Sequence, residues 1–80
     1  MTKREIAAYL SRHTGFVASH INVNDFCNDY ECKPFDIQSI VFNSADNTFI
    51  IQFKKYFKYA FVNLPRRYVA MYLKDFFNYE

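Results

Sequence analysis

Two alternating apolar runs joined by a short polar segment constrain the fold of this chain more than any other feature. Residues 37–42 and 48–53 are rich in Ile, Val and Phe, and the segment between them reads Asn-Ser-Ala-Asp-Asn. This pattern predicts an antiparallel hairpin, because Asn and Asp accept the left-handed conformation that tight turns need. We expect Asp46 or Asn47 at that position. One face of the second strand would carry Phe49, Ile51 and Phe53.

A third alternating run, residues 57–62, predicts a third antiparallel strand with Phe57, Tyr59 and Phe61 on one face. Leu64-Pro65 then predicts the start of a C-terminal helix, because proline has no N–H to lose at the first helical position. Spacings of three, four and seven residues form an apolar stripe on this helix. The stripe comprises Val69, Tyr72, Leu73 and Phe76, and the residues away from it are Arg66, Arg67, Ala70 and Lys74.

The N-terminal residues carry a start and a stop signal for a helix. Thr2 and Glu5 form a capping box, in which each side chain bonds the other residue's backbone N–H. Gly15, the single glycine of the chain, suits the left-handed residue that ends a helix. We expect a helix over residues 3–14. Its apolar face would carry Ile6, Tyr9, Leu10 and a partly buried His13.

The segment 16–35 gives a weaker signal and leaves two alternatives open. Ile21 and Val23 alternate with asparagines, which suits a short edge strand, whereas the spacing of Phe26 and Tyr30 suits one or two helical turns. Pro34 would end either element. We therefore treat this segment as irregular.

These elements predict one α+β domain over residues 1–80, with both helices on one face of a three-stranded antiparallel meander. The N-terminal helix would occupy 1–15, and the strands and last helix 36–80. Aromatic residues make up 21% of the chain, which lets a small domain close a core without disulfides or metal. The aromatics at core-facing spacings are Tyr9, Phe42, Phe49, Phe53, Phe61, Tyr72 and Phe76.

Three motifs in the strand region resemble the KTSC domain family. They are Ser39-Ile-Val-Phe42, Phe49-x-Ile-x-Phe53 and Tyr59-x-Phe61-x-x-Leu64-Pro65. In that family a strand-end aromatic precedes a hairpin, an alternating strand, a Tyr-x-Tyr pair and a Val-Pro that opens a helix. Phe61 replaces the second Tyr here, and Tyr56 stands at the family's turn glycine. The resemblance implies this fold, and RNA binding, which has been suggested for the family.

A basic stretch that holds no acidic residue, residues 54–67, is the candidate binding site. Lysine and arginine neutralise phosphates while tyrosine rings stack on bases, so this mixture favours an anionic ligand, RNA or a nucleotide. The alternative is that the lysines only solvate a strand edge and the aromatics belong to the core. If the second hairpin turns near Lys55, its lysines lie beside the start of the last helix. The candidate residues are Lys54, Lys55, Tyr56, Lys58, Arg66 and Arg67.

Catalysis and cofactors find no support in the sequence. One glycine cannot build a phosphate-binding loop, and no serine or cysteine has the local signature of a nucleophile. Cys27 and Cys32 with His13 and His20 do not have the spacing of a zinc site, so we expect free thiols, no metal and no cofactor. The chain lacks a secretory signal and an apolar run of membrane-spanning length, so we expect a cytoplasmic protein and no membrane partner.

Two further partner hypotheses come from charge and aromatic content. The acidic residues Asp25, Asp29, Glu31 and Asp36 predict a solvated loop or a docking surface for a basic partner. The alternative function is a protein-binding inhibitor or adaptor, such as a small phage-encoded protein that acts on a host machine or defence system. A homodimer through an edge strand or residues 76–79 fits either function.

Overall fold

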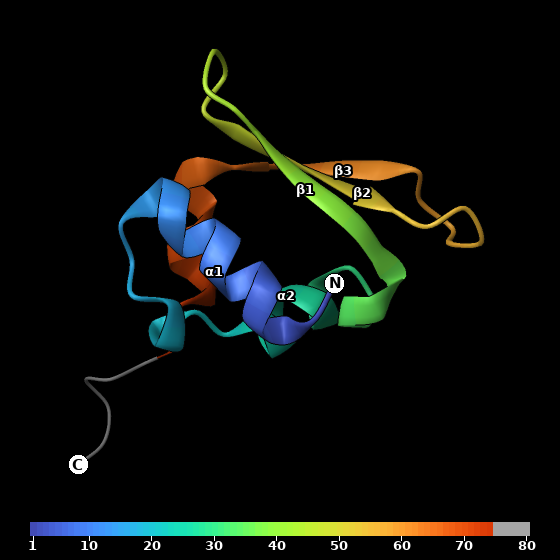
Figure 1. The fold of residues 1–80 in the computed structure, drawn as a ribbon, viewed down its shortest axis with the longest axis horizontal. Helices are drawn as coiled ribbons and strands as arrows, with labels where there is room; N and C mark the ends of the chain where they lie inside the picture. The colour runs from blue at the N-terminus through green and yellow to red at the C-terminus, as the bar shows by residue number, and fades with distance from the viewer. Residues whose placement is uncertain (75–80) are drawn as a thin grey trace.

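The computed structural model describes residues 1–74 and contains one antiparallel sheet with the strand order β1-β2-β3. All the described helices lie on one side of this sheet, and no described element covers its other side (Figure 1). The predicted α+β class, the antiparallel meander and the one-sided arrangement of helices are confirmed. Residues 75–80, including Phe76 of the predicted stripe, lie outside the described part of the chain.

Helix α1 spans Lys3–Thr14, the range that its start and stop signals predict. The Thr2 hydroxyl accepts the Glu5 N–H at 3.1 Å, and the Glu5 carboxylate accepts the Thr2 N–H at 2.8 Å. Gly15 has a φ of 84° and donates its N–H to the Ser11 carbonyl at 3.0 Å. The helix buries Ile6 and Leu10 completely, so the apolar face also matches the prediction.

Gly15→Ala is expected to lower the free energy of unfolding by about 1 kcal/mol, because a side chain at positive φ is strained. Open space surrounds the position of the missing Cβ, so the loss measures backbone strain without a clash. Urea unfolding followed by circular dichroism gives the difference. Gly15→Asn should lose less, because asparagine tolerates this conformation. An equal loss for both variants would contradict the conformational explanation.

The segment 16–35 is more ordered than we expected, and both local alternatives occur at different residues. Ile21 is extended and forms an isolated bridge with Leu73, whereas helix α2 spans Val23–Asp29. Short 3-10 helices, η1 (Ala18–His20) and η2 (Pro34–Asp36), flank these elements. Tertiary contacts decide the outcome, because Phe26 of α2 is fully buried against the rings of Tyr30 and Tyr72.

The predicted hairpin is confirmed. Strand β1 spans Ile37–Asn43 and strand β2 spans Thr48–Phe53. Asn47 has a φ of 54° in the connecting turn, the left-handed position we expected there. The register shifts between Ile37 and Ser39, which marks a β-bulge at the start of β1. The buried side chains of β2 are Phe49, Ile51 and Phe53, as predicted.

Strand β3 is shorter than predicted and has the opposite parity. It spans Phe61–Pro65, so residues 54–60 form a loop. Leu64 pairs with Phe49 and Val62 with Ile51, and residues directly opposite in an antiparallel pair share a face. Phe61 therefore points away from the core and is 57% exposed, so its predicted core position is wrong.

The last described helix, η3, spans Arg66–Tyr72 and has 3-10 geometry. Pro65 is the last residue of β3 and the N-cap of η3, whereas we expected it at the first helical position. A 3-10 helix has about three residues per turn, which places Val69 and Tyr72 on one side. Both are buried, as the stripe predicts, whereas the residues predicted away from it are exposed. These are Arg66, Arg67, Ala70 and Lys74.

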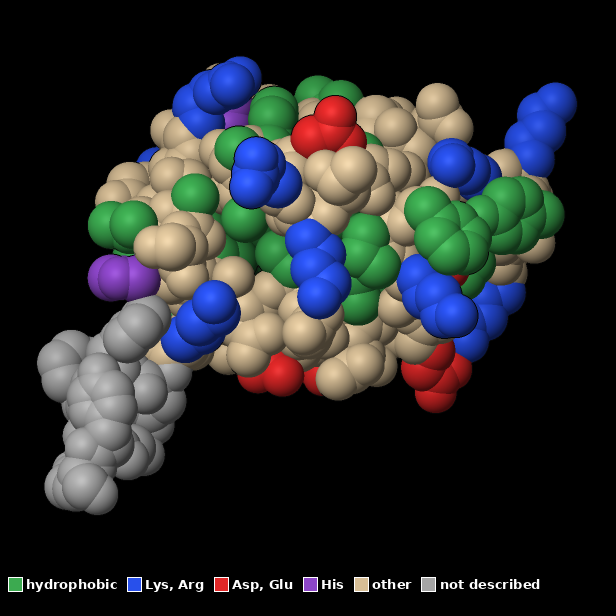
Figure 2. All heavy atoms as spheres, turned by 60° about the horizontal axis from the view of Figure 1, so that its bottom comes forward, with side chains coloured by type: hydrophobic (Ala, Val, Ile, Leu, Met, Phe, Trp, Pro, Cys, Tyr) green, Lys and Arg blue, Asp and Glu red, His purple; other side chains and the backbone are tan. Residues whose placement is uncertain are grey.

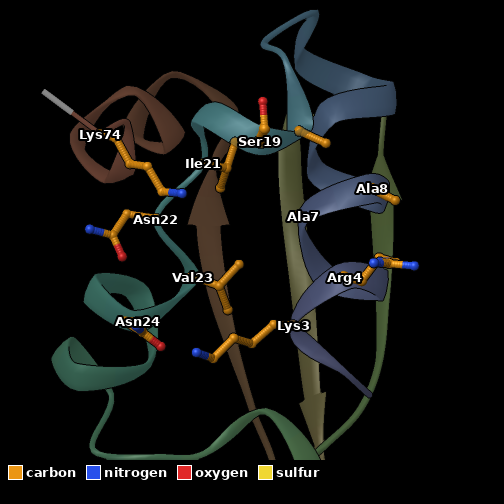
Figure 3. A pocket seen from close by; sticks show the side chains of 11 residues that line it. Lys3, Arg4, Ala7, Ala8, Ser19, Ile21, Asn22, Val23, Asn24 and Lys74 are labelled. Carbon is orange, nitrogen blue, oxygen red and sulfur yellow. The ribbon is translucent and has the colours of Figure 1, made fainter. Parts of the chain in front are cut away.

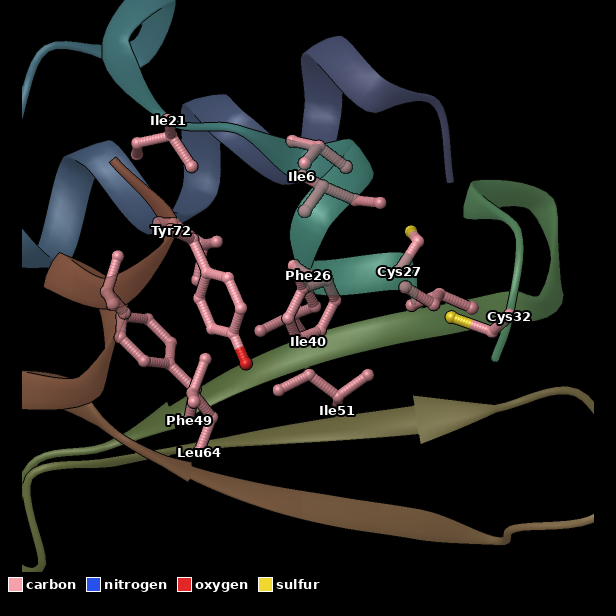
Figure 4. Packing of buried hydrophobic residues seen from close by; sticks show 14 of the residues in the cluster. Ile6, Ile21, Phe26, Cys27, Cys32, Ile40, Phe49, Ile51, Leu64 and Tyr72 are labelled. Atoms are coloured by element: carbon pink, nitrogen blue, oxygen red, sulfur yellow. The ribbon is translucent and has the colours of Figure 1, made fainter. Parts of the chain in front are cut away.

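The hydrophobic core lies between the helices and the sheet, with contributions from every layer (Figure 4). Tyr72 is 5% exposed, and its hydroxyl donates a hydrogen bond of 2.8 Å to the Asp29 carboxylate. This bond satisfies the polar end of a buried ring, and burial raises the pKa of the Tyr72 hydroxyl. The largest fully buried side chains are Phe26, Phe49, Ile6, Leu10, Ile37, Ile51, Leu64 and Val69.

Candidate anionic-ligand site

The structure divides the predicted basic site between opposite ends of the sheet. The lysines and Tyr56 lie in the β2–β3 loop, whereas Arg66 and Arg67 follow β3. Strand β3 has five residues, and at about 3.3 Å per residue it separates the two groups by roughly 15 Å. The Arg66 N–H donates to the Asn47 carbonyl at 2.8 Å, which fixes the arginines beside the β1–β2 turn. The expectation that the lysines lie beside the start of the last helix is therefore wrong.

Tyr56 is exposed, and its hydroxyl is fixed. The residue is 64% exposed to solvent, and its hydroxyl donates a hydrogen bond of 2.7 Å to the Asp36 carboxylate. The same carboxylate accepts the Lys33 N–H at 2.8 Å. These bonds from Lys33 and Tyr56 hold the pKa of Asp36 below its ordinary value. The β2–β3 loop therefore presents one aromatic face in a defined orientation.

Lys58 is the member of the predicted site whose charge is already paired. Its ammonium forms an ion pair with Glu31, which raises the pKa of Lys58 and lowers that of Glu31. It also lies 5.5 Å from the centre of the Tyr59 ring. Phe57 stacks on Phe53 at 4.7 Å between ring centres, so this part of the loop packs onto the end of the core. Among the described lysines of the loop, Lys54 and Lys55 have no ion pair.

Sequence reasoning missed two residues at the same end of the molecule. Phe35 is 57% exposed. The positive charges of Lys33 and Lys54 both contribute to lowering the pKa of Asp36. Lys33 and Phe35 belong to the segment that precedes β1, and the Lys54 N–H donates to the Asp36 carbonyl at 2.9 Å. The sequence could have indicated that these residues lie near Lys54. In an antiparallel hairpin, the residues that precede the first strand lie beside those that follow the second. We call Lys33, Phe35, Lys54, Lys55 and Tyr56 the loop-end patch.

The acidic cluster is mostly exposed to solvent, as we expected, and Asp36 is its one buried member. Asp29 accepts the Tyr72 hydroxyl, Glu31 pairs with Lys58, and Asp36 is 8% exposed. These carboxylates support the fold near the loop-end patch. Asp25, in the first turn of α2, is exposed like Asp29 and Glu31.

Stability is expected to fall on acidification because the pKa of Asp36 is lowered in the folded chain. A depressed pKa stabilises the fold above the ordinary carboxyl value of about 4, and this contribution disappears as protonation proceeds below it. The thermal midpoint measured from pH 7 to pH 2 should therefore decrease most below about pH 4. In Asp36→Asn this decrease should be smaller. A parallel curve for the variant would exclude Asp36 as its cause.

A second basic surface lies between α1 and the segment 18–24, in a groove of about 400 Å³. Lys3 and Lys74 extend into it from its two ends, and Ile21 and Val23 lie between them (Figure 3). Arg4 lies at its α1 side. None of the described residues that line the groove is acidic. We call this feature the helix groove; the sequence analysis missed its cations because they are far apart along the chain.

The helical side of the molecule carries both basic surfaces (Figure 2). Lys and Arg side chains are spread across this side, and hydrophobic side chains gather among them at the right-hand end. That end corresponds to the β2–β3 loop in Figure 1. The arrangement separates an aromatic, basic end from a basic region over the helices.

Within residues 1–74, no group of three His, Cys, Asp or Glu side chains is placed to hold a metal ion. Cys27 and Cys32 are free and buried, and burial raises the pKa of the Cys32 thiol to about 12. Both thiols are thus protonated at neutral pH and poorly suited to nucleophilic attack. No helix in the same range has the length and hydropathy needed to cross a bilayer.

Comparisons with protein-family models, with curated proteins and with solved structures found no match, so the resemblance to the KTSC family stays a prediction.

Proposed function

We propose that this chain is a non-catalytic binding module for an anionic ligand that contains both a base and a phosphate, namely single-stranded RNA or a nucleotide. The loop-end patch is the binding site. The observation that carries the proposal is Tyr56, whose ring is exposed while its hydroxyl is bound to Asp36. A ring held in place loses little conformational entropy when a base stacks on it.

The neighbouring groups suit the rest of such a ligand. Lys54 and Lys55 directly precede Tyr56 in the sequence, and the charges of Lys33 and Lys54 both act on the Asp36 carboxylate. Their ammonium groups attract phosphates, and Phe35 supplies a second exposed ring at the same end of the sheet. Lys58, Arg66 and Arg67 are not part of the proposed site, because Lys58 is paired and the arginines lie at the other end.

Tyr56→Ala tests the proposal directly. Loss of one stacking ring is expected to weaken RNA binding by about 1 kcal/mol, close to fivefold in Kd. Fluorescence polarisation with a labelled single-stranded RNA at low salt measures this change, and competition with a nucleoside triphosphate separates RNA from nucleotide binding. Tyr56→Phe keeps the ring but removes its bond to Asp36, so its affinity should lie between those of the unmodified protein and Tyr56→Ala.

Tyr68→Ala is the matched control. Tyr68 is 43% exposed and lies 4.9 Å from the Arg67 guanidinium, so it is another accessible tyrosine beside a cation. It follows β3, at the far end from the loop-end patch. Its replacement should leave the affinity unchanged. Absence of binding by the unmodified protein, or equal losses from both alanine variants, would refute the proposed site.

Protein binding is the second candidate function, and the uncovered face of the sheet favours it. Val41 and Phe61 are 47% and 57% exposed on this face, and the residues of β1, β2 and β3 that share it carry no charge. Such a surface suits an apolar contact with a host protein or a second copy of the chain. Light scattering measures self-association, and Phe61→Lys should abolish it if this face forms the contact.

A further inference from the structure

The two outer strands of the sheet, β1 and β3, have edges of different kinds (Figure 1). The edge of β1 is occupied near both of its ends. The Met1 ammonium donates to the Ile37 carbonyl at 2.8 Å, and the Phe42 N–H donates to the Tyr9 hydroxyl at 2.9 Å. The β-bulge at the start of β1 also interrupts this edge. The N-terminus and α1 therefore protect the β1 edge against pairing with another strand.

The outer edge of β3 is open. Just before β3, the Ala60 carbonyl accepts the Phe53 N–H at 3.0 Å, and just after it, the Arg66 N–H donates to the β1–β2 turn at 2.8 Å. Backbone groups alternate between the two sides of an antiparallel strand, so the N–H and C=O groups of Phe61 and Asn63 point away from β2. Within residues 1–74, no hydrogen bond reaches these outward groups.

Strand β3 lacks the features that usually protect an edge. It carries no charged side chain, and its register with β2 continues without a bulge. Phe61 is 57% exposed, and Asn63 is also exposed. Pro65 has no N–H to donate, but it occupies only the last position of the strand. The β3 edge can therefore accept another strand.

We infer that β3 pairs in antiparallel orientation with β3 of a second copy, around a two-fold axis at Asn63, so that two sheets join into one. In this register Asn63 lies opposite Asn63, and Phe61 lies opposite Pro65. Each Asn63 N–H donates to the Asn63 carbonyl of the other copy, and each Phe61 N–H donates to the Pro65 carbonyl opposite. The missing N–H of Pro65 leaves only the Phe61 carbonyl without a donor. The Phe61 ring lies beside Pro65 of the second copy on the uncovered face.

Symmetry, charge and closure favour a second copy as the occupant of this edge. The register around Asn63 is symmetric, so both copies use the same outward groups, as a two-fold contact requires. Because β3 is uncharged, two chains with a net charge of +2 each place no like charges directly opposite one another in the pair. Because the β1 edge is protected, each chain offers one open edge, and pairing ends at a dimer instead of continuing into a fibre.

This contact is separate from the loop-end patch and does not depend on RNA binding. The positive charges lie beyond the ends of β3, where the antiparallel pair brings the β2–β3 loop of one copy near η3 of the other. Salt screens the resulting repulsion, so dimerisation should strengthen as the salt concentration rises, whereas RNA binding should weaken. RNA titrations with dilute protein at low salt therefore report on the single chain.

Sedimentation equilibrium of the full chain tests the inference at concentrations up to about 1 mM, the Kd range of weak complexes. A weak monomer–dimer equilibrium is expected, because a five-residue strand pair buries less than the about 1,600 Å² of a standard interface. Amide hydrogen exchange locates the contact. Phe61 and Asn63 should gain protection as the concentration rises, whereas Val62 and Leu64 bond to β2 and should be protected throughout.

Asn63→Pro removes the central N–H of the contact without removing a bond to β2, so it should raise the dimer Kd at least tenfold. Asn63→Ala keeps this N–H and is the matched control, with a Kd close to that of the unmodified chain. Circular dichroism checks that each variant is folded. Asn63→Lys is a second variant that keeps the N–H, and it should also weaken the dimer because it places two ammonium groups opposite each other.

Val41→Lys separates the β3 edge from the uncovered face, because Val41 lies on that face in β1, and it should leave the dimer unchanged. The inference would be overturned by a chain that stays monomeric at every concentration, by equal Kd values for Asn63→Pro and Asn63→Ala, or by loss of the dimer in Val41→Lys. Assemblies larger than a dimer would contradict the protected β1 edge. Asn63→Pro should bind RNA normally and Tyr56→Ala should dimerise normally, so failure of this inference and failure of the RNA proposal give different results.

Discussion

Phe49→Ala is expected to lower the free energy of unfolding by about 3 to 5 kcal/mol, the usual cost of removing a buried phenylalanine ring. Phe49 is completely buried, and its ring lies 4.9 Å from that of Phe42 and 6.1 Å from those of Tyr9 and His13, measured between centres. The substitution removes contacts that join β2 to α1. Because small domains are stable by only about 5 to 15 kcal/mol, much of the total would be lost. Urea unfolding in dilute solution, followed by circular dichroism, measures the difference.

Phe61→Ala is the control for this experiment, since it removes the same side chain from the same sheet. Phe61 is 57% exposed and points away from the helices, so its loss should change the free energy of unfolding by less than about 0.5 kcal/mol. The pair also tests the register of β3. If both substitutions cost the same, Phe61 would have to face the core, as its spacing in the sequence suggested.

Local signals predicted much of the fold because the interactions behind them span few residues. The capping box of α1, the left-handed Gly15 and the Asn47 turn all occur where the sequence places them. The parity of Phe61 failed because alternation was counted through residues 54–60, which form a loop. Side-chain parity persists only while the backbone remains extended, so a loop resets it.

The candidate site shows the same limit at longer range. Lys54, Lys55 and Tyr56 are adjacent, so any structure keeps them together. Arg66 and Arg67 also belong to the acid-free stretch, but β3 carries them to the opposite end of the sheet. The helix groove forms only when α1 packs beside the segment 18–24, and that packing leaves no periodic signal in the sequence.

RNA binding, if it occurs at the loop-end patch, is expected to weaken about 20-fold between 50 and 200 mM salt. The estimate assumes that Lys33, Lys54 and Lys55 each neutralise one phosphate of a single strand, which gives a log–log slope near −2. Lys54→Gln/Lys55→Gln leaves one such contact. Its slope should fall to about −0.7, so the same change in salt should weaken binding only about threefold. Polarisation titrations at several salt concentrations give both slopes.

Arg66→Gln/Arg67→Gln removes the same net charge and is therefore the matched control. Phosphates held by Lys54 and Lys55 would lie far from these arginines, because β3 separates the two groups by roughly 15 Å. Their replacement should leave the slope near −2. A slope that falls equally in both double variants would show that net charge, rather than the loop-end patch, determines binding. A slope that falls only in the lysine variant assigns the phosphate contacts to Lys54 and Lys55, and through them to the end of the sheet where Tyr56 is exposed.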